Sequence, residues 1–206
     1  MSGIMNYNGS AIVAMAGEKC VAIAADTRYG IRELQTVSCQ RQKIFQLTNK
    51  TFVGLAGLAT DVQTMASKLE FSLKLFELRE ERVMQPKTIG NMISHTLYQS
   101  RFGPWLTEPV VAGLDSAGDP FMCAFDFIGA MSQAKDFVVS GTSSEQLFGV
   151  CESFWRPNMD KDELFETISQ CLLSAVDRDC LAGWGGVVHV ITEDQIITKR
   201  LKGRMD

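Results

Sequence analysis

The first third of the chain consists of short apolar runs separated by polar turns, a pattern typical of β-strands. Two such runs, residues 10–16 and 20–25, flank the sequence Gly17-Glu18-Lys19 and therefore predict two strands joined by a tight turn. The same pattern predicts three further strands, at residues 34–39, 43–47 and 51–55.

The hydrophobic period then changes to that of helices. One helical face is formed by the apolar side chains Val62, Met65, Ala66, Leu69, Leu73 and Phe76. Thr60 with Gln63 predicts a capping box at the start of this helix. A second helix is predicted after Pro86, where helical spacing is repeated by Ile89, Met92, Ile93 and Leu97.

The second half repeats this order. Strands are predicted at residues 110–114, 121–127 and 137–139. Two helices follow, one beginning at the cap Thr142 with Glu145 and the other at Asp160 with Glu163. The chain closes with a predicted hairpin of residues 187–192 and 196–201.

The order of strands, helix pair, strands, helix pair and strands differs from the strict alternation of a doubly wound parallel sheet. It favours an α+β fold of largely antiparallel sheets covered by helix pairs. No internal repeat, linker or low-complexity segment divides the chain, so we expect one domain over residues 1–206, with short unpaired ends at residues 1–8 and 203–206.

Composition narrows the class of protein. Of the 206 residues, 46% are hydrophobic and 21% are charged, which is globular composition and excludes a disordered chain. The net charge of −4 gives no overall attraction to nucleic acid or to an anionic membrane, so we expect neither as a partner. Without a long apolar run or a signal-peptide pattern, we expect a soluble intracellular protein.

Cysteine and histidine usage argues against a disulfide framework or a metal site. The six cysteines include no Cys-x-x-Cys pair and have mostly apolar neighbours, which predicts buried thiols. His95 and His189 are the only histidines, and we interpret His189 as a hydrogen-bonded strand histidine rather than a ligand. We therefore expect neither a metal nor a cofactor.

Five short motifs carry candidate chemistry, in chain order: Gly9-Ser10, Ala24-Ala25-Asp26-Thr27-Arg28, Gln42-Lys43-Ile44-Phe45, Val138-Val139-Ser140-Gly141-Thr142 and Asp177-Arg178-Asp179-Cys180-Leu181-Ala182-Gly183. In this order and among these predicted elements, they resemble the β subunits of the 20S proteasome core, members of the N-terminal-nucleophile hydrolase class. The resemblance covers nearly the whole chain. It is also carried by the stretches GLAGLATDVQT, RFGPWLTEPVVAGLD, DFVVSGT, CESFWRPNMD and LFETISQ.

The resemblance implies a four-layer α-β-β-α sandwich with two mainly antiparallel sheets between helix pairs. It also implies a place in an α7β7β7α7 barrel, where the partners are other α and β subunits and, indirectly, regulatory particles, in the cytoplasm and nucleus. In active relatives a processed N-terminal threonine is the nucleophile, and its freed α-amine accepts the proton.

Mapped residue by residue, the resemblance places Asp26, Lys43 and Asp179 on the family's catalytic aspartate, lysine and second aspartate. Ser140 falls on its catalytic serine, and Gly183 lies in the last motif. The nucleophile's place is taken by Ser10 rather than threonine. Ala182 replaces a serine and cannot form a side-chain hydrogen bond. The interval from Asp26 to Lys43 is also one residue longer than in catalytic members.

Three functions remain open at this stage. The stretches quoted above resemble a subunit type that stays uncut and inactive, which implies a structural ring subunit with residues 1–9 kept as an extension and the mapped residues as a vestigial pocket. The alternative is an active serine-type peptidase formed by cleavage at Gly9–Ser10. Without the resemblance, the chain is an unassigned α/β binding domain.

The mapped residues also have structural interpretations. Asp26 and Arg28 could form a strand-end salt bridge or a turn anchor, and Lys43 could have a similar role. Ser140 and Thr142 could close a strand and cap a helix. The glycines from Gly183 to Gly186 fit a turn with close backbone approach, because no phosphate-loop motif accompanies them.

Overall fold

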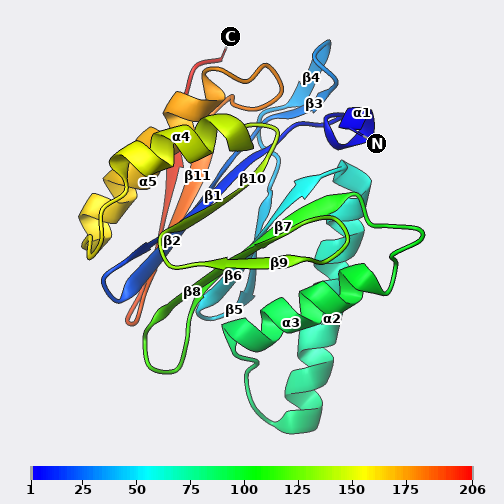
Figure 1. Ribbon diagram of the computed structural model, residues 1–206, viewed down its shortest axis with the longest axis vertical. Coiled ribbons are helices and arrows are strands. Elements are labelled where there is room, and N and C mark those ends of the chain that lie inside the picture. The colour runs from blue at the N-terminus through cyan, green and yellow to red at the C-terminus, as the bar shows by residue number, and fades with distance from the viewer. Residues whose placement is uncertain (1, 206) are drawn as a thin grey trace.

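Two five-stranded antiparallel sheets pack face to face in the computed structural model, which describes residues 2–205 (Figure 1). The first sheet has the order β10-β1-β2-β11-β12 and is formed by β1 (Ala11–Gly17), β2 (Cys20–Asp26), β10 (Phe137–Gly141), β11 (Gly186–Thr192) and β12 (Ile196–Leu201). The second runs β5-β6-β7-β8-β9 and is formed by β5 (Ile44–Thr48), β6 (Thr51–Gly57), β7 (Thr107–Leu114), β8 (Pro120–Phe125) and β9 (Met131–Ala134).

Helix pairs cover the outer faces of both sheets. Figure 1 shows α4 (Ser144–Phe154) and α5 (Lys161–Val176) over the first sheet and α2 (Ala59–Glu80) and α3 (Pro86–Tyr98) over the second. The layers are therefore α-β-β-α, which confirms the predicted fold class. None of the helices within residues 2–205 is long and apolar enough to cross a membrane.

The central strands of both sheets are apolar on both faces because each sheet lies between two hydrophobic layers. In β1, Val13 and Met15 pack toward α4 and α5, whereas Ile12 and Ala14 pack toward the second sheet. A third layer lies between the second sheet and α2 and α3. Burial on both faces explains why these strands appear in the sequence as continuous apolar runs rather than as an alternating pattern.

The two sheets approach each other closely at Gly54 of β6. A Cβ atom on Gly54 would lie 2.7 Å from Cγ2 of Ile12 on the facing sheet. Since real carbon atoms do not approach this closely, a larger residue at position 54 would push the sheets apart. Gly54 therefore sets the local spacing of the sandwich.

Several short elements escaped the sequence prediction. The predicted strand 34–39 is β4 (Gln35–Ser38), which pairs with the unpredicted strand β3 (Tyr29–Ile31) in a separate hairpin. β9 was also missed, and β8 ends earlier than predicted. The prediction of buried thiols is confirmed for Cys20, Cys123, Cys151 and Cys171 but was wrong for Cys39 and Cys180, which are exposed.

The N-terminal end is not unpaired, contrary to the prediction. Residues 2–5 form a short helix, α1 (Ser2–Met5). The buried side chain of Asn8 donates from Nδ2 to the carbonyl of Gly30 at 2.9 Å, and its Oδ1 accepts from the backbone N–H of Ala59 at 2.8 Å. Asn8 therefore satisfies a free N–H at the start of α2 from 51 residues away.

This contact corrects the capping box predicted at Thr60. The residue at the N-cap of α2 is Leu58, whose side chain cannot cap, and the cap is supplied by Asn8 instead. In contrast, the predicted cap at the start of α5 is confirmed, because Asp160 accepts from the N–H groups of Asp162 and Glu163.

Replacing Asn8 with alanine is expected to lower the free energy of unfolding by about 1–2 kcal/mol, since the helix loses its cap and the buried Gly30 carbonyl loses its donor. Urea denaturation of the purified chain measures this change. The matched control is Thr60→Ala, at the exposed position that the sequence suggested, where we expect less than about 0.5 kcal/mol. Equal losses in the two variants would contradict the assignment of Asn8 as the cap.

Candidate functional site

The candidate site is organised around Asp26, the last residue of β2, whose side chain is completely buried. One carboxylate oxygen accepts from the backbone N–H of Ala11 at 2.9 Å and from Nζ of Lys43 at 2.6 Å. The other accepts from the N–H groups of Arg28 at 3.2 Å and Gly183 at 3.1 Å. Asp26 thus joins the end of its own strand to three segments that are distant in sequence.

Lys43 connects this carboxylate to the peptide bond that processing would have to cleave. Its Nζ donates to the carbonyl of Gly9 at 3.1 Å as well as to Asp26. Burial lowers the pKa of Lys43, an effect that the neighbouring carboxylate of Asp26 opposes. The longer interval between Asp26 and Lys43, which contains the β3–β4 hairpin, does not prevent this pairing.

Ser10 is held by its backbone. Its N–H donates to Oγ1 of Thr142 at 3.2 Å, and the same hydroxyl lies 3.1 Å from the carbonyl of Ser10 and 2.7 Å from Oδ2 of Asp179. Oδ2 also accepts from the hydroxyl of Ser143. Within residues 2–205, the Oγ of Ser10 forms no hydrogen bond. Asp179 therefore acts on the Ser10 backbone through Thr142.

Thr142 and Ser143 are the residues of this cluster whose role the sequence analysis missed. Thr142 was predicted to cap α4, but the N-cap residue is Ser143, whose side chain makes no capping bond. Both hydroxyls are directed to Asp179 instead. Their position directly after a strand that pairs with β1 is the signal that could have revealed them.

Two mapped residues lie outside this hydrogen-bond network. The hydroxyl of Ser140 donates to the backbone carbonyl of Glu108 on β7 at 2.9 Å, so it links the two sheets. Ala182 is buried in the apolar layer beneath α4 and α5. The structure therefore brings together Ser10, Asp26, Lys43, Asp179 and Gly183, but it does not bring the Ser140 hydroxyl to them.

Arg28 is a turn anchor rather than an ion-pair partner of Asp26. Its buried guanidinium donates to the carbonyl of Leu181 at 2.8 Å, to Oγ1 of Thr36 at 3.0 Å and to the carbonyl of Arg32 at 3.3 Å. Only its backbone N–H contacts the Asp26 carboxylate. Arg28 therefore fastens the β3–β4 hairpin to the loop that contains Leu181.

The residues before Ser10 leave little space beside it. Gly9 has φ +71°, and a Cβ atom there would lie 2.2 Å from the carbonyl oxygen of Leu181. The cavity next to Ser10 is only about 20 Å³ and is lined by Asn8, Gly9, Ser10, Arg28, Tyr29, Arg41, Lys43, Leu55, Gly57, Ala59 and Val62. This volume holds about one water molecule.

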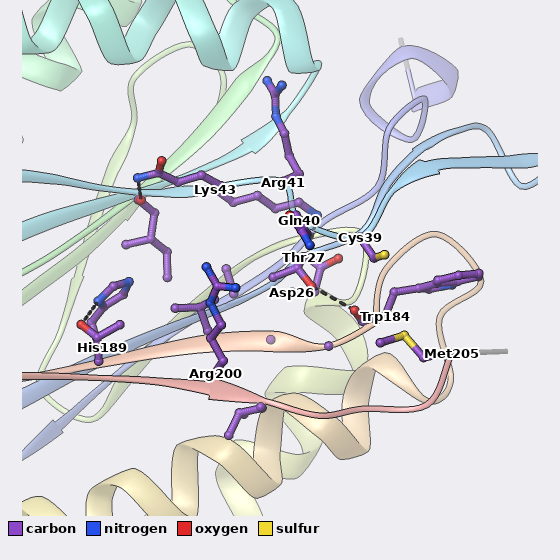
Figure 2. Close-up of a pocket in the computed structure, with 18 residues that line it drawn as sticks. Asp26, Thr27, Cys39, Gln40, Arg41, Lys43, Trp184, His189, Arg200 and Met205 are labelled. Atoms are coloured by element: carbon purple, nitrogen blue, oxygen red, sulfur yellow. Dashed lines mark hydrogen bonds and ion pairs between the residues drawn. The ribbon is translucent and has the colours of Figure 1, made fainter.

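A larger cleft, of about 490 Å³, opens on the other side of Asp26 and Lys43 (Figure 2). His189 on its wall stacks on Phe52 at 5.0 Å between ring centroids and hydrogen-bonds Thr198 through Nδ1, so it is the hydrogen-bonded strand histidine that was predicted. Burial lowers the pKa of His189. Within residues 2–205, no group of three or more histidine, cysteine or acidic side chains is arranged to hold a metal ion.

Hydroxyl catalysis requires a proton acceptor next to the nucleophile. The nitrogen of Ser10 is an amide that donates to Thr142, and an amide is not a base at neutral pH. Lys43 is already engaged by Asp26 and by the Gly9 carbonyl. The arrangement is suited to holding the Gly9–Ser10 peptide in place.

The family model and the similar proteins that match this chain all identify the same family. The family model described as "Proteasome subunit" matches residues 6–191. The chain is 55% identical over 203 residues to "Proteasome subunit beta type-3" of Picea mariana and to "Proteasome subunit beta type-3-A" of Arabidopsis thaliana, and 53% identical to "Probable proteasome subunit beta type-3" of Schizosaccharomyces pombe. Each alignment covers 98% of this chain and 99% of the relative. The chain therefore belongs to the proteasome subunit family.

Proposed function

We propose that this chain is a non-catalytic structural subunit of the 20S proteasome core, of the beta type-3 kind for which its relatives are named. It completes a β-ring of the α7β7β7α7 barrel and holds catalytic neighbours in position, so that the particle degrades proteins through those neighbours. The chain acts as one unit over residues 1–206, in the cytoplasm and nucleus, and keeps residues 1–9.

The observation that carries this proposal is the integration of the segment before Ser10. Asn8 is buried and caps α2, and Gly9 lies against the backbone of Leu181. Cleavage at Gly9–Ser10 would release residues that the fold uses as structural support. The cavity of about 20 Å³ beside Ser10 holds only about one water molecule.

Exposed apolar side chains support the assembly part of the proposal. Leu34 at the β3–β4 hairpin, Leu78 near the end of α2 and Phe102 after α3 are 87%, 80% and 98% exposed. Exposed apolar side chains at these three places are available for contacts with neighbouring subunits.

The proposal predicts the size of the native species and the mass of the chain. A tagged copy expressed at its natural level should migrate in gel filtration with a particle many times its own 22.8 kDa. Intact-mass analysis of the subunit from that particle should show that the residues before Ser10 are retained. Ser10→Ala should leave every peptidase activity of the particle unchanged at equal incorporation.

The serine-type alternative predicts the opposite results. It requires a chain that begins at Ser10 and a peptidase activity that Ser10→Ala abolishes. Either result in normally assembled particles would overturn the non-catalytic assignment, and a stable monomer as the main native species would overturn the assignment to a ring.

A further inference from the structure

Asn8 and Gly9 form the only Asn-Gly pair in the sequence. In such a pair the backbone nitrogen of glycine can reach the asparagine side chain, because glycine has no Cβ atom to hinder the approach. Each of the other asparagines precedes a residue that carries a side chain; they are Asn6, Asn49, Asn91 and Asn158. Asn8 is therefore the asparagine whose local sequence most favours loss of the side-chain amide, the reaction that makes asparagine thermolabile.

Loss of the amide begins with attack of the Gly9 backbone nitrogen on Cγ of Asn8. A bond forms between these two atoms, the bond from Cγ to Nδ2 breaks, and the proton released by the Gly9 nitrogen leaves with Nδ2 as ammonia. Water then opens the resulting succinimide ring at either of its carbonyl carbons. Opening gives aspartate, or isoaspartate, in which the main chain continues through the side-chain carboxyl group. Overall, one water is consumed and one ammonia is released.

The native fold holds the side chain that would have to react. Nδ2 of Asn8 donates to the carbonyl of Gly30 at 2.9 Å, and Oδ1 accepts from the N–H of Ala59 at 2.8 Å. Asn8 is only 5% exposed. Ring closure requires this side chain to leave both partners, and breaking hydrogen bonds in a buried position costs free energy.

The backbone on both sides of this side chain is held as well. The carbonyl of Tyr7 accepts from the N–H of Arg32 at 2.7 Å, and the carbonyl of Gly9 accepts from Nζ of Lys43 at 3.1 Å. Gly9 is packed so closely that a Cβ atom there would lie 2.2 Å from the carbonyl oxygen of Leu181. Backbone rotation toward the geometry of the ring would therefore have to break these contacts.

We propose that Asn8–Gly9 is a deamidation site that the native fold silences, so that it reacts in chains that have not folded. Aspartate lacks the Nδ2 donor to the Gly30 carbonyl and places a carboxylate oxygen there instead. Isoaspartate lengthens the backbone by one carbon atom where Gly9 lies against Leu181. Both products destabilise the fold, so the reaction marks chains that fold late. The site belongs to the fold of the chain and does not depend on assembly into a particle.

Peptide mass spectrometry after incubation at mildly alkaline pH tests this proposal. The native sample is the tagged protein as isolated without denaturant, and the unfolded sample is the same material in guanidinium chloride. Conversion of Asn8 should be at least about tenfold slower in the native sample, because it requires local opening of the fold. Asn49 is the internal control: it lies exposed in the β5–β6 turn, so its rates in the two samples should agree within about twofold. In denaturant, Asn8 should convert faster than Asn49.

Ala59→Pro tests whether the contacts of Asn8 provide the protection. Ala59 is the first residue of α2, where proline is compatible with a helix, and proline removes the N–H that Oδ1 of Asn8 accepts. This variant should raise the native rate of conversion about two- to tenfold, the factor that corresponds to one hydrogen bond, and leave the rate in denaturant unchanged. The matched control Thr60→Ala keeps the contact and should leave both rates unchanged.

Asn8→Asp reproduces the aspartate product and should unfold at a lower denaturant concentration than the parent chain. Any of four results would overturn the proposal. Asn8 could convert equally fast in the native and unfolded samples, or no faster than Asn49 in denaturant. Ala59→Pro could leave the native rate unchanged, or the Asn8→Asp chain could be as stable as the parent. None of these results bears on whether the chain is a ring subunit, so this inference and the proposed function can fail separately.

Discussion

Asp26→Ala is expected to lower the free energy of unfolding by about 3–5 kcal/mol, the usual cost of removing one partner from a buried ion pair. The substitution leaves the buried Nζ of Lys43 with the Gly9 carbonyl as its remaining partner. It also removes the acceptor for three backbone N–H groups, those of Ala11, Arg28 and Gly183. Urea denaturation of the purified chain measures the loss.

Two controls make this result specific. Asp119→Ala breaks an ion pair of similar length with Lys19, but both side chains are 61% exposed, so we expect a loss below about 1 kcal/mol. The double variant Asp26→Leu with Lys43→Met removes both buried charges and should be more stable than Asp26→Ala. Similar losses for Asp26→Ala and Asp119→Ala would contradict a structural role for the buried pair.

The Asp26→Ala variant also tests whether Asp26 takes part in peptide cleavage. In particles matched for subunit incorporation, Asp26→Ala should leave each peptidase activity unchanged, since the proposed function assigns turnover to neighbouring subunits. Loss of one class of peptide cleavage with normal assembly would instead identify Asp26 as part of an active site.

Gly9→Ala is the second substitution with a large expected effect, a loss of about 2–5 kcal/mol in the free energy of unfolding. An L-residue at φ +71° is strained, and the new Cβ would lie 2.2 Å from the carbonyl oxygen and 2.6 Å from the Cβ of Leu181. Because the nearest atom belongs to the backbone, the clash cannot be relieved by rotating a side chain.

Gly149→Ala is the matched control for this substitution. Gly149 lies within α4, where an added Cβ meets nothing within 4 Å, so alanine should raise stability by about 0.5–1 kcal/mol. Thermal or urea unfolding of the two variants should therefore shift in opposite directions. A Gly9→Ala variant as stable as the parent chain would show that the segment before Ser10 can move away from Leu181.

The regular elements were predictable because their burial is periodic. The helical spacing of Val62, Met65 and Leu69 corresponds to one buried face of α2, and the apolar runs in β1 and β2 correspond to strands buried on both faces. β9 was missed because its residues are mostly exposed and carry no hydrophobic pattern. The cap at Thr60 was predicted wrongly because the actual cap, Asn8, acts across tertiary structure, which local rules do not include.

The candidate site was less predictable for the same reason. Nothing in the spacing of Asp26, Lys43 and Gly183 requires them to meet, and their convergence follows from the pairing of β2 with β11 and from the packing of the two sheets. Family resemblance located these residues, but it did not predict that Ser140 would hydrogen-bond a carbonyl on the opposite sheet. Side-chain direction depends on the local register, which a motif does not specify.

The position of the first hairpin has a consequence for synthesis of the chain. β1 and β2 lie in the middle of their sheet, and their flanking strands come from the second half of the chain, since Ile12 pairs with Ser140 and Asp26 with Gly186. Such pairing has high contact order and must wait until translation is nearly complete. Until then, a hairpin that is apolar on both faces stays exposed on the ribosome, and such a surface is prone to aggregation.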